Sequence, residues 1–242
     1  MSIQGIENIQ EESLEDEDLE KVMPKGKSKA EEFKNNGDWT YWADIVAKMK
    51  TLNPGIGISI EPDALPAIKE TLDRKKKEAE KGKEWLYFAS LASDLKRINP
   101  EMDIVDDKAK EKILEQIKET GDKKNWHDYV RLLSMMKIID KNASPVPSDE
   151  MKAAIIADAG NRVRTYGSGR GSFDDINYAA NVRMVFTEMS QGDLSSEMGV
   201  DAGVLNRAQN DLEHPVAELA ASDYFSKKAD LRILTTEKLN IP

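Results

Sequence analysis

Residues 39–53 read Trp-Thr-Tyr-Trp-Ala-Asp-Ile-Val-Ala-Lys-Met-Lys-Thr-Leu-Asn, and the same pattern returns at 85–99 and, more loosely, at 126–140. Each copy has a tryptophan first, an aromatic residue three positions later and further apolar residues at helical spacing. Side chains spaced in this way lie on one face of a helix, so each copy predicts an amphipathic α-helix. The aligned residues include Trp39, Trp85 and Trp126, then Trp42, Phe88 and Tyr129, then Met49, Leu95 and Met136.

A turn that ends a helix follows the first two copies. Asn53-Pro54-Gly55 follows the first copy and Asn99-Pro100 the second, and proline cannot continue the hydrogen-bond ladder of a helix. The tryptophans recur at intervals of roughly 40–46 residues, which is typical of arrays of two-helix repeats. The sequence therefore predicts an all-α protein in which residues 33–148 form a three-unit array of two-helix repeats with short extended links.

Two features of the repeats allow either a structural or a functional interpretation. The tryptophans could be packing anchors or an aromatic binding ridge, and their fixed helical spacing favours packing in the core. Lysines also recur inside the apolar pattern, as Lys50, Lys96 and Lys137. They could form a stripe that faces a ligand, although lysine stems more commonly lie along the edge of a core.

Composition limits the classes of partner. The chain has 45 acidic and 35 basic residues, a formal net charge of −10, and no cysteine. The negative charge disfavours unspecific attraction to nucleic acid or anionic membranes, and the lack of cysteine excludes disulfides and thiolate metal sites. No apolar run approaches the roughly 18 residues of a membrane span, and the N-terminus is acidic, so we expect a cytoplasmic protein with no membrane partner.

Residues 1–32 open the chain with a highly charged segment. Its first 20 residues hold eight carboxylates and no basic side chain. Such a segment buries too little apolar surface to offset chain entropy, which predicts an acidic mobile tail. A weak apolar stripe that includes Leu14, Leu19 and Val22 leaves a second interpretation, a short helix that docks on a partner.

A Pro- and Ser-rich stretch at residues 142–149 predicts a domain boundary, with a separate helical domain at 149–242. In that domain, the loop Gly-Ser-Gly-Arg-Gly-Ser at 167–172 has glycines that would let backbone amides approach a phosphate. Arg162, Arg164 and Arg170 would supply the positive charge. The alternative for this loop is a flexible linker.

Residues 189–215 contain two short helical patterns separated by a glycine turn. Gly199 permits a sharp turn with positive φ, and Asp201 can cap the second helix. The spaced residues are Ser190, Gln191, Leu194, Ser195, Met198, Gly199, Val200, Leu205 and Pro215. This spacing resembles the helix-turn-helix of phage-repressor-type DNA-binding domains. The resemblance implies a second helix in the major groove, with Gln191, Asn206 and Arg207 facing DNA. The alternative is a structural hairpin with the same turn chemistry.

No catalytic motif is apparent. The two histidines, His127 and His214, have no metal-ligand spacing around them, and no serine lies in a Gly-x-Ser-x-Gly elbow. We therefore expect no enzyme activity, no metal site and no cofactor. The sequence predicts a non-enzymatic helical-repeat interaction or assembly protein, a scaffold that acts through contacts with protein partners. The alternative is a DNA-binding regulator that uses residues 189–215.

Overall fold

The computed structural model describes residues 16–186, 191–213 and 221–235, and all of their regular secondary structure is α-helical, which confirms the predicted all-α class. None of the helices in these ranges is both long and apolar enough to cross a membrane. The helices are α1 (Asp16–Asn35), α2 (Trp39–Leu52), α3 (Leu65–Gly82), α4 (Leu86–Ile98), α5 (Asp107–Asp122), α6 (Trp126–Ile139), α7 (Asp149–Gly167), α8 (Phe173–Val185), α9 (Gln191–Met198), α10 (Ala202–Glu213) and α11 (Ala221–Thr235).

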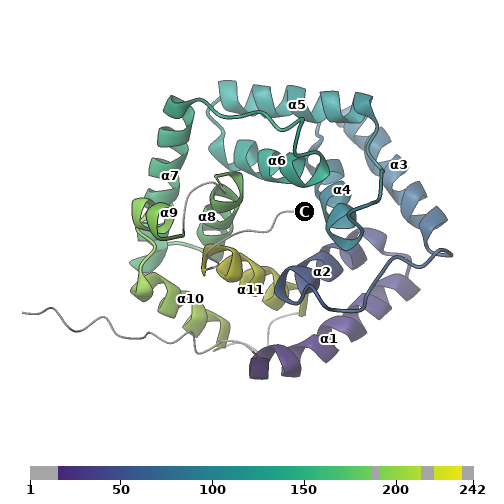
Figure 1. Cartoon of the computed structure of the whole chain (residues 1–242), viewed down its shortest axis with the longest axis horizontal. Coiled ribbons are helices and arrows are strands. Elements are labelled where there is room, and N and C mark those ends of the chain that lie inside the picture. Colours follow the sequence, from purple (N-terminus) through teal and green to yellow (C-terminus); the bar gives the residue numbers. More distant parts are fainter. Residues whose placement is uncertain (1–15, 187–190, 214–220, 236–242) are drawn as a thin grey trace, which may run out of the picture.

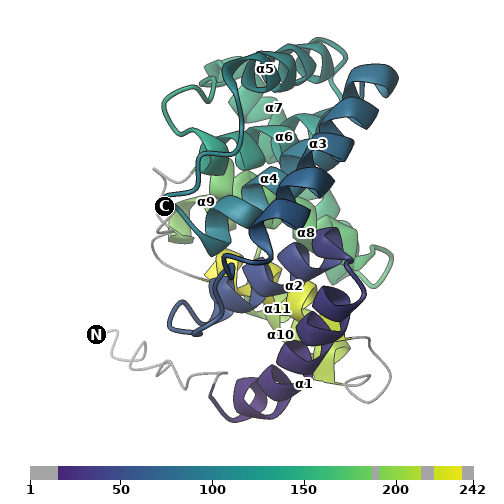
Figure 2. The same cartoon turned by 90° about the vertical axis from the view of Figure 1, so that its right-hand side faces the viewer.

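Two layers of helices form a ring (Figure 1). The inner layer consists of α2, α4, α6, α8 and α11, each of which packs against the next. The outer layer contains α1, α3, α5, α7 and α10. The ring closes where α11 packs against α2, and α1 lies beside both helices at this seam (Figure 2). The five inner helices therefore form a closed series, in which each helix contacts two others.

The first tryptophan of each repeated stretch begins or immediately precedes an inner helix. Its ring meets, edge to face, the aromatic ring three residues later, one helical turn away. The centroid distances are 5.7 Å for Trp39–Trp42, 5.5 Å for Trp85–Phe88 and 6.1 Å for Trp126–Tyr129. These contacts match the interpretation of the tryptophans as packing anchors. The three-unit repeat array itself stays a prediction.

Positive side chains join inner helices at their C-terminal ends. Lys50 in α2 donates to the carbonyl of the last residue of α4 at 3.0 Å, and Lys137 in α6 donates to the last carbonyl of α8. Arg232 in α11 donates to the last carbonyl of α2 at 2.6 Å, across the seam. The final carbonyls of a helix lack helical partners and carry partial negative charge, so a cation there satisfies and stabilises them. Lys96 instead donates to Met102 in the link after α4.

Helix α1 occupies part of the segment for which the sequence predicted a mobile tail, residues 1–32. Residues 1–15 lie outside the described residues, but from Asp16 the chain is helical. Val22 and Ala30 are buried, in a helix that packs against α2 and α11. The tail interpretation fails here because the seam between α2 and α11 offers an apolar surface, which composition alone cannot reveal.

Gly26 lies between these two buried residues on the same face of α1. A β-carbon at this position would overlap the ring of Phe225 in α11 and lie 2.7 Å from Sδ of Met49 in α2. The absence of a side chain therefore sets how closely α1 approaches the seam.

The segment for which the sequence predicted a separate domain, residues 149–242, contributes to the same ring. Helix α8 packs against α6, while α11 packs against α8 and α2. A three-unit array alone would leave an unpaired face on its first and last inner helices, and α8 and α11 cover those two faces. Buried residues on these helices include Ile176, Ala179, Val182, Phe225, Ala229 and Leu234.

Candidate functional site

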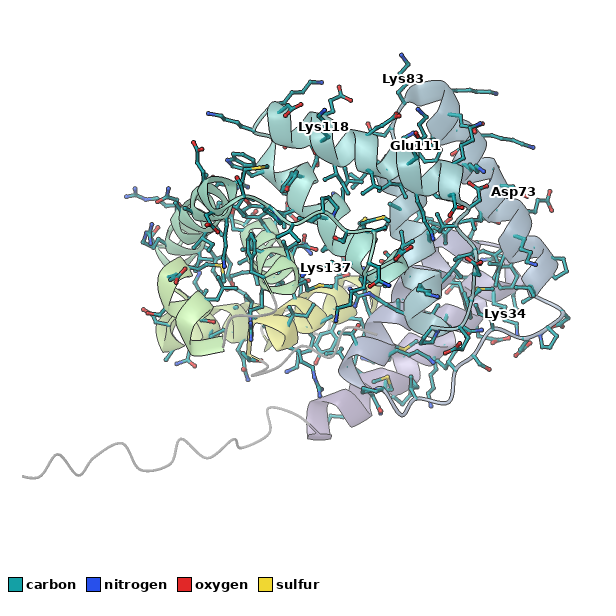
Figure 3. All side chains as sticks on the ribbon, turned by 45° about the horizontal axis from the view of Figure 1, so that its top comes forward. Lys34, Asp73, Lys83, Glu111, Lys118 and Lys137 are labelled. Carbon is teal, nitrogen blue, oxygen red and sulfur yellow. The ribbon has the colours of Figure 1, made fainter. Side chains whose placement is uncertain are left out.

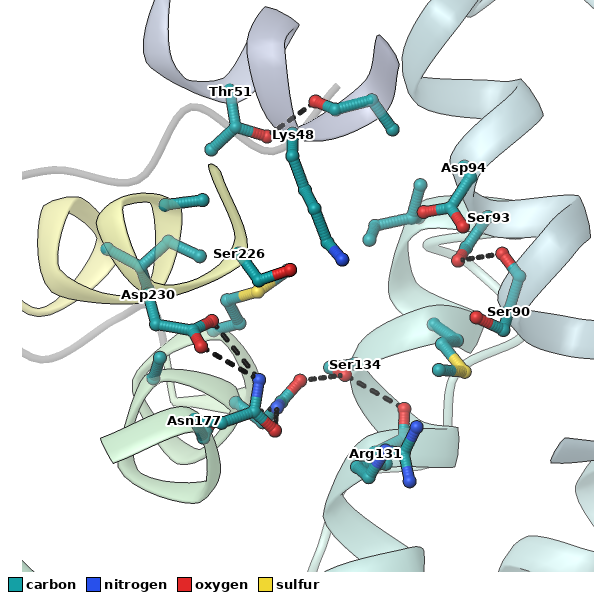
Figure 4. Close-up of a pocket in the computed structure, with 18 of the residues that line it drawn as sticks. Lys48, Thr51, Ser90, Ser93, Asp94, Arg131, Ser134, Asn177, Ser226 and Asp230 are labelled. Carbon is teal, nitrogen blue, oxygen red and sulfur yellow. Dashed lines mark hydrogen bonds between the residues drawn. The ribbon is translucent and has the colours of Figure 1, made fainter. Parts of the chain in front are cut away.

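A cavity of about 460 Å³ lies inside the ring and is lined by all five inner helices (Figure 4). Most of its lining is polar, although helices at the centre of a protein usually turn apolar side chains inward. The polar residues are Asp44, Lys48, Thr51, Ser90, Ser93, Asp94, Arg97, His127, Arg131, Ser134, Asp174, Asn177, Asn181, Ser226 and Asp230.

On α2 and α4, the two cations of the cavity have different partners. Lys48 Nζ lies 2.6 Å from the carboxylate of Asp44, one turn away on α2. One guanidinium nitrogen of Arg97, on α4, donates to Oγ1 of Thr51 on α2 at 3.1 Å. Another contacts Sδ of Met184 on α8 at 3.6 Å. Burial lowers the pKa of Arg97, but a guanidinium titrates so far above neutrality that it stays charged.

A chain of hydrogen bonds connects α6, α8 and α11 around the cavity (Figure 4). The Ser134 hydroxyl donates to Oδ1 of Asn181 at 2.9 Å, and Nδ2 of Asn181 donates to Oδ1 of Asn177 at 3.3 Å. Nδ2 of Asn177 then lies 3.0 and 3.2 Å from the two carboxylate oxygens of Asp230. Linked bonds of this kind fix the orientation of each member, so Asp230 has a defined position.

Asp94 and Asp230 lie deep in the protein and keep part of their surface open to the cavity. Burial, the largest cause, and the nearby Asp44 carboxylate together raise the pKa of Asp94 to about 7, against the opposing effect of Arg97 and Lys48. Burial also raises the pKa of Asp230 to about 6, against the effect of the hydrogen bond from Asn177. Both carboxyl groups therefore change charge near neutral pH, as functional carboxyls often do.

These cavity residues are not among the site residues predicted from the sequence, although their positions recur in the three repeated stretches. Four lining positions are shared by the three aligned stretches in α2, α4 and α6, and His127 is an additional one in α6. The aligned sets are Asp44, Ser90 and Arg131; Ala47, Ser93 and Ser134; Lys48, Asp94 and Met135; and Thr51, Arg97 and Ile138. A second helical face, more polar than the apolar one, thus runs through each copy of the repeat.

The three arginines predicted to bind phosphate lie in different surroundings. Nε of Arg162 is 3.1 Å from the carboxylate of Asp158. Arg164, two residues further along α7 and so on another side of the helix, donates to Oδ1 of Asn161 at 2.8 Å. Arg170 is exposed in the turn between α7 and α8. Two of the three guanidinium groups thus have partners within the chain, and the phosphate site stays a prediction.

The segment that resembles a helix-turn-helix forms the pair α9 and α10, with the expected turn between them. Gly199 has a φ of 72°, as its place in the pattern predicted. Asp201 accepts a hydrogen bond from the backbone N–H of Val204 at 3.0 Å and so caps α10. The turn and the cap of the predicted pattern are thus present, and DNA binding stays a prediction.

The residues predicted to face DNA are placed only in part. Asn206 is exposed, and the side chain of Gln191 lies outside the described residues. The Arg207 guanidinium lies 5.4 Å from the centroid of the Tyr166 ring, and its Nε is 3.8 Å from Asp211. The Tyr166 hydroxyl donates to the same carboxylate at 2.7 Å. Arg207 thus packs between α7 and α10 of its own chain.

Among the described residues, no group of three or more histidine, aspartate or glutamate side chains is arranged to hold a metal ion. Comparisons with protein-family models, curated proteins and solved structures give no match to this chain.

Proposed function

We propose that this chain is a non-enzymatic interaction protein whose ring of helices binds a small polar ligand in its central cavity. The observation that carries the proposal is that all five inner helices direct polar side chains into one space of about 460 Å³. Ligand sites commonly have volumes of about 300–1,000 Å³.

The polar groups of the cavity are also held in place. The hydrogen bonds from Ser134 to Asp230 span three helices, and Arg97 is fixed by Thr51 on a fourth. Groups fixed before a ligand arrives lose less entropy on binding, so they recognise a ligand more strongly than mobile groups would. This arrangement supports binding as the task of the cavity.

The test is binding of polar metabolites, with a variant that fills the cavity. Native mass spectrometry of the protein from its own cells should detect a bound small molecule, and thermal shift with a metabolite panel should identify binders. Ser90→Leu adds an apolar side chain to the cavity wall at a residue whose hydroxyl makes no hydrogen bond within the described chain. It should weaken binding at least tenfold.

Glu111→Leu is the matched control, because Glu111 is exposed on α5 and points away from the ring (Figure 3). It should bind ligand as the parent does. If no compound binds the parent, or if both variants bind normally, the cavity is not the functional site. Turnover of a bound compound would contradict the non-enzymatic part of the proposal.

Contacts with protein partners remain part of the proposal, and two tyrosines support it. Tyr41 and Tyr87 occupy the same position in the first two repeated stretches, and 63% and 68% of their surfaces are exposed. Exposed tyrosines are enriched where proteins associate. Replacing both with serine should remove a partner from affinity-purified complexes without changing ligand binding. Unchanged recovery of every partner would exclude this pair as the contact.

A DNA-binding regulator is the alternative, and the turn at Gly199 is the observation that favours it. Arg207→Ala separates the two functions. If α10 reads DNA, the variant should lose salt-sensitive binding to duplex DNA, at a cost of about 1–3 kcal/mol. In our proposal the parent binds no duplex at moderate salt. The variant should then only lose stability, by about 0.5–1 kcal/mol, because it removes the contact with Tyr166.

A further inference from the structure

Opposite charges face the cavity without forming a direct ion pair. Asp94 and Arg97 are three residues apart on α4, a spacing at which such side chains commonly pair. Neither side chain has an ion-pair partner among the residues that the structure describes, and the carboxyl group of Asp94 has no hydrogen bond there either. Their charges nonetheless influence one another. A positive and a negative group are thus available in the same cavity.

The positions of these groups explain why the charges stay separate. Arg97 is held by its hydrogen bond to Thr51 on α2, and Asp230 is held by Asn177 on α8. Part of the Asp94 surface is open to the cavity. Figure 4 shows Asp94 and Asp230 on opposite sides of this cavity. Separated charges in a poorly solvated space attract ligand groups strongly, because little reorganisation is needed when the ligand enters.

The charges of the cavity wall also balance. Lys48 pairs directly with Asp44, although its charge also acts on Asp94 and Asp230. Above about pH 7, where Asp94 and Asp230 are ionised, these two carboxylates equal in number the remaining guanidinium groups, Arg97 and Arg131. Asp174 also lines the cavity, but it is exposed to solvent. A ligand with a net charge would leave one charge uncompensated in this space, which is costly. A ligand that carries one charge of each sign would not.

We propose that the cavity takes a small zwitterion, a molecule of amino-acid or dipeptide size with one ammonium and one carboxylate group. The ammonium lies against Asp94, and the carboxylate accepts hydrogen bonds from Arg97, whose planar guanidinium suits a carboxylate. This inference rests on the proposed function, since it names the class of ligand for the same cavity.

Isothermal titration calorimetry at pH 8, where Asp94 is ionised, with charge-deleted analogues tests the inference. The probes are the standard free amino acids and a set of dipeptides, which separate the two sizes of ligand. The best binder is then compared with its C-terminal amide, which lacks the anion, and with its N-acetyl derivative, which lacks the cation. Each analogue should bind at least tenfold more weakly than the parent compound, and Glu111→Leu should leave all three affinities unchanged.

Asp94→Asn assigns the ammonium contact to this residue. The variant should bind the zwitterion at least tenfold more weakly, and it should no longer distinguish the free amine from the N-acetyl derivative, because the group that recognises the charge is gone. Circular dichroism and thermal melting confirm that the variant is folded. Asp73→Asn on the exposed surface of α3 should keep the full discrimination of the parent (Figure 3).

The outcomes distinguish failure of the zwitterion inference from failure of the proposed ligand-binding function. If an amide or an N-acetyl derivative binds as tightly as the zwitterion, the ligand needs only one charge and the inference is overturned. The same holds if only other polar metabolites bind, or if folded Asp94→Asn keeps the discrimination of the parent. In each of these cases the cavity remains a polar ligand site. If no compound of any class binds, the proposed function falls together with the inference.

Discussion

Asp94→Asn should make the protein more stable at pH 8, although Asp94 lies in the proposed site. Its carboxyl has a pKa of about 7 in the folded protein, against an ordinary value of 3.8. At pH 8 the group is ionised in both the folded and unfolded states, and a shift of about three units corresponds to about 4 kcal/mol. Part of the carboxyl surface is open to the cavity, where water lowers this cost, so we expect a gain of about 2 kcal/mol.

The direction of the pH dependence follows from the raised pKa. Between pH 4 and pH 7 the folded protein holds the Asp94 proton that the unfolded chain has lost. The contribution of this group to stability is therefore fully present below about pH 4, falls as the pH rises to about 7 and is constant above that. Urea unfolding followed by circular dichroism should show parent and variant nearly equal at about pH 4, with the variant ahead by about 2 kcal/mol at pH 8.

Asp73→Asn provides the control, because this carboxyl is exposed on α3. It should change the unfolding free energy by less than about 0.5 kcal/mol at every pH. Two results would contradict this reasoning: Asp94→Asn is no more stable than the parent at pH 8, or the difference in unfolding free energy is the same at pH 4 and pH 8. Either result would show that the ionised Asp94 carboxylate does not destabilise the folded protein.

Two further predictions concern the seam of the ring. Gly26→Ala should lower the melting temperature, because the overlap with both Phe225 and Met49 costs about 2–3 kcal/mol and outweighs the roughly 1 kcal/mol gained from helix propensity. Gly82→Ala, where the nearest atom is 4.0 Å away, should be neutral or stabilising. Equal melting temperatures for the two variants would contradict the close packing of α1. Arg232→Ala should reduce the unfolding free energy by about 1.5–3 kcal/mol, since it removes a charged hydrogen bond to the Leu52 carbonyl, and a change below about 0.5 kcal/mol would show that this bond does not stabilise the seam.

Part of the site could have been predicted from the repeats. Asp94 and Arg97 lie on a polar face that the three stretches share, and the period of the helix is enough to place them together. Asp230 and Asn177 belong to segments without that pattern, and only ring closure brings them to the same cavity. The raised pKa of Asp94 could not be predicted either, because burial, which causes it, depends on residues far away in the sequence.

The sequence by itself determined the helical elements and several of their ends. Apolar spacing in residues 39–53 and its copies specifies helices, and Gly199 specifies a turn with positive φ, because both depend on neighbours within a few residues. Only the tertiary structure decided that α1 is part of the fold, that α8 and α11 join the inner layer, and that the inner helices close into a ring. These features depend on contacts between apolar faces of helices that are far apart in the sequence. The local sequence pattern predicts that a helix has an apolar face, but not which distant helix will pack against it.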